Sequence, residues 1–177
     1  MGKNISLLIV FVLSLCSCKA QDTTTDKTVV KDFDIDRYLG SWYEIARFDH
    51  RFERDLVGVK ATYSYREDGM IKVVNSAYKE TLDGEKSEAI GKAKIPNPME
   101  ASKLRVSFFW IFYSDYLVFE LDEDYQWAVV GSQSDNYLWI LSRQPIMEES
   151  LYSDLLARIK NRGYDTSKLI RVKQKAN

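Results

Sequence analysis

Hydrophobic and polar residues alternate strictly over residues 57–66. This period of two is typical of a strand with one buried face and one solvated face. Glu67-Asp68-Gly69 follows directly and is typical of a hairpin turn, because glycine adopts a positive φ without steric cost. The residues expected on the buried face of this strand are Val57, Val59, Ala61, Tyr63 and Tyr65.

Similar segments continue along most of the chain. A second turn is expected at Asp83-Gly84, and no helical pattern separates the segments, so antiparallel neighbours joined by short turns are the simplest arrangement. With the strand at 57–66, the further strands expected before residue 144 are 42–49, 70–78, 87–95, 101–109, 116–122, 125–133 and 137–143.

The periodicity changes near the C-terminus. Residues 148–162 carry an apolar stripe at helical spacing, with Glu148 and Glu149 at the expected N-terminus and Gly163 at the expected C-cap. A last short strand is expected at 169–172. The pattern predicts an all-β fold, namely an eight-stranded up-and-down antiparallel barrel with one C-terminal α-helix packed outside and a short final strand. Closure of the sheet removes exposed edges, which favours a barrel over a sandwich.

Two of the predicted strands carry small residues on their apolar face. The strand at 87–95 places Ala89, Gly91 and Ala93 on that face. In the strand at 70–78, the side chains on the apolar face become smaller toward Ala77. Small inward residues leave volume in a barrel that holds one small ligand. Asn75 is the lone polar residue of the inward set. It either contacts a ligand or bonds to backbone or water.

The N-terminus has the pattern of an export signal. Lys3 precedes an apolar run at 5–15 that is too short to span a bilayer. Leu15-Cys16-Ser17-Cys18 resembles a bacterial lipobox, although an ordinary cleaved signal without lipid is an alternative. The expected boundaries are 1–17 for the signal peptide, 18–33 for a flexible tether lipidated at Cys18, and 34–177 for the barrel domain. Lys19 after the cysteine favours the outer membrane.

The composition narrows the possible functions. The chain of 177 residues has 25 Lys plus Arg and 26 Asp plus Glu, so no excess positive charge is available to bind nucleic acid. One histidine and two cysteines leave little material for a metal site or a nucleophile-base pair. We therefore expect no catalytic residues, no metal and no cofactor.

Three motifs carry a resemblance to the lipocalin family, and within it to the bacterial outer-membrane lipoproteins related to apolipoprotein D. Residues 40–47, Gly-Ser-Trp-Tyr-Glu-Ile-Ala-Arg, resemble the Gly-x-Trp signature of the first lipocalin strand. Ser134-Asp-Asn-Tyr137 stands where the family has Thr-Asp-Tyr, and it departs by one residue and by Ser for Thr. The resemblance extends from about residue 34 to 174. It implies that Gly40, Trp42 and Arg143 close one end of the barrel, with the guanidinium stacked on the indole.

The same resemblance places two loops at the open mouth. One contains the apolar run at 108–113, which forms a pocket lip, touches a membrane or contacts another subunit, so a homodimer is possible. The other is the loop at 49–55, where His50, Arg51 and Arg54 either meet an anionic headgroup or pair with neighbouring charges in solvent.

These features favour a binding protein for an acyl-chain ligand, a fatty acid or lysophospholipid, anchored to the outer membrane through its N-terminal lipid. A structural envelope lipoprotein with incidental lipid and a lipid-modifying enzyme are the alternatives. The expected ligand-binding residues are Val59, Ala61, Ile71, Val73, Asn75, Ala77, Ala89, Gly91, Val106, Phe108, Tyr116 and Trp139.

Overall fold

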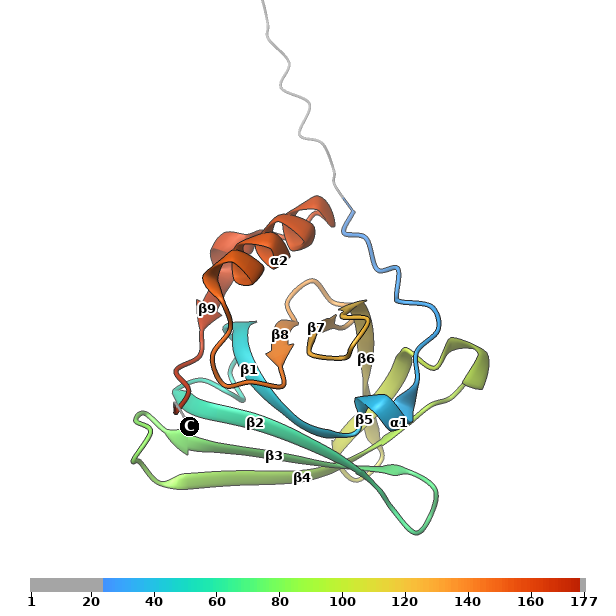
Figure 1. The fold of residues 1–177 in the computed structure, drawn as a ribbon. Coiled ribbons are helices and arrows are strands. Elements are labelled where there is room, and N and C mark those ends of the chain that lie inside the picture. Colours follow the sequence, from blue (N-terminus) through green and yellow to red (C-terminus); the bar gives the residue numbers. More distant parts are fainter. Residues whose placement is uncertain (1–23, 176–177) are drawn as a thin grey trace, which may run out of the picture.

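The computed structural model describes residues 24–175, and these form a barrel with one helix packed on its outside (Figure 1). The predicted signal peptide, the predicted lipobox and Cys18 lie outside the described residues. The barrel strands are β1 (Gly40–Phe48), β2 (Leu56–Tyr65), β3 (Ile71–Lys79), β4 (Lys86–Lys94), β5 (Lys103–Phe109), β6 (Phe112–Leu121), β7 (Trp127–Gly131) and β8 (Leu138–Ser142). The remaining elements are α1 (Ile35–Tyr38), η1 (Pro98–Glu100), α2 (Glu149–Asn161), η2 (Thr166–Lys168) and β9 (Leu169–Arg171).

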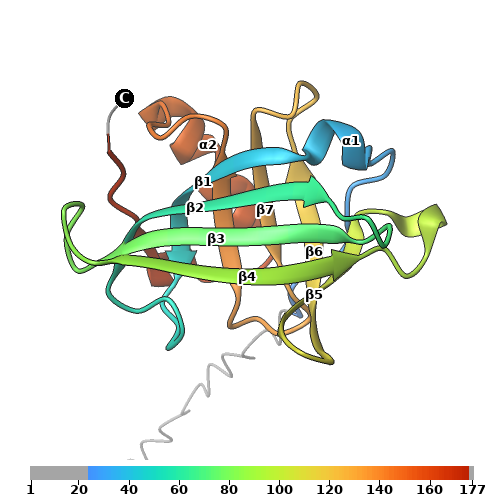
Figure 2. The same ribbon diagram turned by 90° about the horizontal axis from the view of Figure 1, so that it is seen from below.

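Strand pairing confirms the predicted barrel. Each strand from β2 to β7 pairs antiparallel with the next one, and β1 closes the sheet by pairing with both β2 and β8. The second half of β1 also pairs with β9, which adds a short strand outside the eight-stranded barrel. The long strands β2, β3 and β4 lie side by side across one wall (Figure 2).

The up-and-down order gives the barrel two distinct ends. The connections 49–55, 80–85, 110–111 and 132–137 lie at one end, which we call the open end. The connections 66–70, 95–102, 122–126 and 143–148 lie at the other, which we call the closed end because α1 and Trp42 cover it. The two-residue connection at 110–111 differs from expectation. Phe109 pairs with Phe112, so most of the apolar run belongs to the β5–β6 hairpin.

The helix α2 covers the outer wall of the barrel as predicted. Leu155 and Ile159 are fully buried, and they pack with outward residues of the strands such as Phe119 and Ile140. Gly163 has a φ of +88° and its N–H donates to the Lys160 carbonyl at 2.9 Å, so the expected glycine ends the helix.

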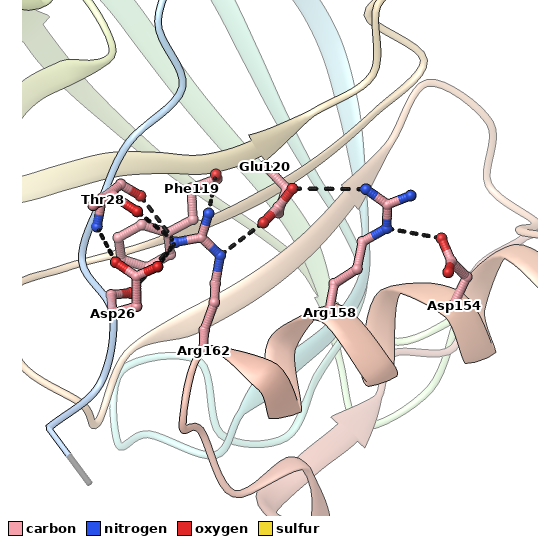
Figure 3. A network of polar contacts seen from close by, with 7 residues as sticks. All are labelled: Asp26, Thr28, Phe119, Glu120, Asp154, Arg158 and Arg162. Atoms are coloured by element: carbon pink, nitrogen blue, oxygen red, sulfur yellow. Dashed lines mark hydrogen bonds and ion pairs between the residues drawn. The ribbon is translucent and has the colours of Figure 1, made fainter.

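Residues 24–33, which we call the strap, lie against the barrel, whereas the sequence predicted a flexible tether over 18–33. The Val30 N–H donates to the Val118 carbonyl of β6 at 3.0 Å. Arg162 at the end of α2 donates to the Thr28 carbonyl at 2.9 Å and pairs with Glu120 of β6 at 2.7 Å (Figure 3). The polar residues that indicated a flexible tether instead form hydrogen bonds and ion pairs with the wall of the barrel. For residues 18–23 the tether stays a prediction, because they lie outside the described residues.

Candidate ligand site inside the barrel

A bulge in β1 decides which of its side chains enter the barrel. Ile45 and Ala46 are consecutive, yet both pack in the cluster between the barrel and α2. The register shifts between Glu44 and Ala46, so Glu44 stands opposite Leu141 and Arg47 opposite Trp139, both of which face inward. The bulge therefore places Glu44 and Arg47 inside the barrel.

Trp42 and Arg143 seal the closed end. The Arg143 guanidinium lies 3.8 Å from the centroid of the Trp42 ring, a cation–π geometry. It also donates to the Tyr125, Ser41, Arg37 and Tyr38 carbonyls at 2.8–3.2 Å. Gly40 has a φ of +94°, and a Cβ there would lie 3.3 Å from the Arg143 Nη1 atom. The glycine allows this close approach of the guanidinium.

Three tyrosine hydroxyls meet above this seal. The Tyr38 and Tyr116 hydroxyls are 2.6 Å apart, and the Tyr63 hydroxyl donates to that of Tyr116 at 3.1 Å. Burial raises the pKa of Tyr63 to about 12 and raises the pKa values of Tyr38 and Tyr116 well above their usual value. The three phenols are therefore neutral, and they form a polar floor to the lumen.

A buried charged network lies in the open half. Arg47 donates to Glu44 at 2.7 Å and to the Glu53 carbonyl at 2.6 Å. The Trp139 indole N–H donates to the Glu53 carboxylate at 3.0 Å, and the His50 Nε2 atom lies 3.2 Å from the same carboxylate. Two carboxylates and one imidazole thus surround a single guanidinium.

The buried network favours neutral forms of its titratable groups. Desolvation, helped by the Glu53 charge, raises the pKa of Glu44 to about 8 against the pull of Arg47. Desolvation also raises the pKa of Glu53. Burial, followed by the Arg47 charge, lowers the pKa of His50 to about 4. Near pH 7 the imidazole is uncharged and the Glu44 carboxyl keeps its proton.

Several buried polar atoms have no hydrogen-bond partner within residues 24–175. They are the Arg47 Nε, both ring nitrogens of His50 and the Asn75 Oδ1. Buried polar groups are normally paired, and unpaired ones occur at sites that take a ligand or water. Among the same residues, no group of three His, Cys, Asp or Glu side chains has the geometry to hold a metal ion.

A Lipocalin-like domain model matches residues 33–174. The chain belongs to the lipocalin family. The outer membrane lipoprotein Blc of Vibrio cholerae is 48% identical over 146 residues, which cover 82% of this chain and 85% of that protein. The protein of the same name from Escherichia coli K12 is 44% identical and covers 89% of both chains.

More distant lipocalins share the architecture. Rat apolipoprotein D is 33% identical over 161 residues, which cover 84% of this chain and 80% of that protein. Among solved structures, insecticyanin of the tobacco hornworm Manduca sexta superposes with a TM-score of 0.68 at 22% identity, with 85% of each chain covered. The predicted resemblance to bacterial lipoproteins and apolipoprotein D is confirmed.

The expected ligand residues of this lipocalin separate into two levels. Ile71 and Val73 are buried in the cluster around Trp42, together with Val106, Tyr116 and Trp139, which keep part of their surface accessible. The second level is the row Ala61, Asn75 and Ala89 across β2, β3 and β4, which begins beside the first level because Ala61 stands opposite Trp42 and packs against its cluster. Val59 and Ala77 are buried in the same wall, whereas Ala89 is exposed.

Gly91 and Phe108 meet at the wall between β4 and β5. A Cβ at Gly91 would lie 2.8 Å from the Phe108 ring, so the glycine makes room for that ring. Phe108 itself is 44% exposed. Only Lys92–Lys94 of β4 pair with β5, so the two strands are hydrogen-bonded toward the closed end.

The sequence did not predict the charged network, and the expectation of an apolar lumen with Asn75 as its lone polar side chain was wrong. Glu44 was detectable, because strict alternation from Trp42 places it inward. Arg47 was not, since the same alternation places it outward without the bulge. Glu53 and His50 belong to the loop at 49–55. There the exposed Arg54–Asp49 pair at 3.2 Å agrees with the alternative of charges paired in solvent.

Two hollows lie on the outside of the lipocalin domain. One of about 350 Å³ is lined at the open end by residues that include His50, Asp135 and Tyr137. The other, of about 160 Å³, lies between β9 and the connection 143–148. No helix in the described part of the chain has the length and apolar character needed to cross a membrane.

Proposed function

We propose that this lipocalin is a lipid-binding protein of the outer membrane, anchored through an acylated Cys18, that holds a fatty acid or a lysophospholipid in the barrel lumen. The family supports a binding role, and its relatives named outer membrane lipoprotein support the location. Residues 15–18 supply the cysteine that such an anchor needs.

The observation that carries the proposal is the contrast between the two halves of the inner wall. The closed half is filled by large buried rings such as Trp42, Tyr38 and Tyr63. Toward the open half, the small row Ala61, Asn75 and Ala89 runs across three strands from the position opposite Trp42. Interiors without a ligand are packed to crystal density, so small side chains on the inner wall favour an occupant.

Hydrophobic burial supplies enough free energy for such a ligand. About 15 methylene groups at roughly 0.8 kcal/mol each contribute ~12 kcal/mol. Association costs about 4–15 kcal/mol, so affinities up to about the micromolar range follow without an ion pair. The neutral form of Glu44 near pH 7 keeps the charge of the lumen low.

The test is a titration of the delipidated protein with a fluorescent fatty acid and with a lysophospholipid. We expect saturable binding at one ligand per chain. Ala61→Trp fills the inner wall and should weaken both ligands at least tenfold. Lys60→Trp is the matched control, because Lys60 is the adjacent residue on the outer face, opposite Tyr43, and should leave both affinities unchanged.

The other outcomes separate the alternatives. No saturable uptake by the folded protein supports a structural lipoprotein and contradicts the proposal. Hydrolysis of the lysophospholipid that is lost in Glu53→Gln supports an enzyme that uses the His50–Glu53 pair. Near-ultraviolet circular dichroism of each variant shows that a lost affinity is not a lost fold.

A further inference from the structure

The strap fixes where the N-terminal chain leaves the barrel. Thr25 and Lys27 contact Asp135 at 2.5 and 2.6 Å, and Asp135 lies in the connection 132–137 at the open end. Further along, the Asp34 N–H donates to the Tyr125 hydroxyl at the closed end at 2.8 Å. The strap therefore begins at the open end and runs along β6 to α1 at the closed end (Figure 1).

The contacts of the strap hold this exit point. Arg162, only 13% exposed, bonds to both the strap and β6, and the Asp26 N–H donates back to the Arg162 carbonyl at 2.8 Å (Figure 3). Lys27 also donates to the Tyr164 hydroxyl at 2.7 Å. The strap thus forms part of the folded domain, and its first described residue marks a fixed position at the open end.

The reach of the remaining chain limits how the domain can face a membrane. Cys18 and Thr24 are six residues apart, which spans at most about 22 Å when fully extended. A lipid on Cys18 therefore keeps the start of the strap, and with it the neighbouring connection 132–137 of the open end, within that distance of the bilayer.

The open end carries an exposed apolar hairpin tip. Phe109, Trp110, Ile111 and Phe112 are 64–77% exposed at the β5–β6 turn. Trp110 has a φ of +49°, a conformation that Asn or Gly adopts at lower cost in a two-residue turn. Local structure alone therefore disfavours a tryptophan here. Aromatic residues on soluble surfaces are unfavourable but are preferred at the membrane–water interface.

From these two observations we propose that the open end of the barrel rests on the bilayer that holds the anchor, with the tip at 109–112 inserted at the level of the lipid headgroups. The inference rests on the anchor in the proposed function. The lumen then opens toward the membrane, so a lipid passes between bilayer and barrel without crossing bulk water.

The test uses the full chain, exported and processed, reconstituted in vesicles of phosphatidylethanolamine and phosphatidylglycerol. Ile111→Cys at the tip and Met99→Cys at the closed end are labelled with a polarity-sensitive fluorophore. Met99 is the matched control, because it is an apolar residue that is 90% exposed. We expect a blue shift of the label at 111 and quenching by brominated lipid, with neither effect at 99. Phe109→Ser with Trp110→Ser should remove the blue shift at 111.

Each other result overturns the proposal in a recognisable way. A water-like spectrum at 111 in an acylated protein, or a blue shift at 99, refutes the orientation and leaves the ligand site intact. A blue shift at 111 without vesicles assigns the tip to contact between copies of the chain. An intact mass without acyl chains refutes the anchor, and with it both the location and this orientation, whereas the lumen titration still tests ligand binding separately.

Discussion

Arg143→Ala should destabilise the barrel by removing the seal at its closed end. The guanidinium donates four hydrogen bonds to backbone carbonyls and lies 3.8 Å from the Trp42 ring. The side chain is half-buried, so we take ~0.5 kcal/mol for each hydrogen bond, below the value for fully buried charged donors. The cation–π contact adds about 1–2 kcal/mol. The sum predicts a loss of about 3–4 kcal/mol in the free energy of unfolding.

Urea denaturation followed by tryptophan fluorescence measures this loss as a lower midpoint with an unchanged slope. Arg158→Ala is the matched control, because Arg158 is half-exposed and its ion pairs with Asp154 at 2.8 Å and Glu120 at 3.9 Å together contribute at most about 1 kcal/mol. Arg143→Lys keeps the charge but not the planar fork, so it should recover less than half of the loss. A loss for Arg143→Ala no larger than that of Arg158→Ala refutes the reasoning.

Two further predictions concern the charged network and the strap. In the folded state Glu44 keeps its proton up to its pKa of about 8. The protonation of His50 differs between the folded and unfolded states mainly below pH 6.5. The unfolding free energy should therefore fall by about 1 kcal/mol as the pH rises from 6.5 to 8. Glu44→Gln should remove most of this slope in urea midpoints, and an unchanged slope contradicts the assignment. Arg162→Ala should speed hydrogen exchange of the Asp26 and Val30 amides at least tenfold, whereas Arg158→Ala, which does not touch the strap, should not; equal exchange in both variants refutes the clamp.

Periodic features of this chain were predictable, and features that depend on one residue or on distant partners were not. The alternation in β2 and the helical stripe of α2 repeat over ten or more residues, so most of their buried faces could be read directly. At the two ends of β2 the expectation was wrong, because a register shift pairs Val57 with Tyr78 of the outer face and Tyr65 is 54% exposed. The bulge in β1 is a single extra residue without a periodic signal, and it turns Arg47 inward. The strap is polar throughout, and its order depends on Arg162, more than 130 residues later in the chain.

The arrangement of polar groups inside the barrel constrains how a lipid can lie there. The charged network is contributed by β1, β8 and the loop at 49–55, whereas the small side chains Ala61 and Ala77 belong to β2 and β3. An acyl chain that lies along the β2–β4 wall leaves the contacts of Arg47 and Glu53 intact. This position therefore has the lowest cost in broken buried polar contacts. The tyrosine hydroxyls, with Tyr116 at their centre, limit its depth. In the proposed function the headgroup then remains at the open end, where the apolar tip and the start of the strap also lie.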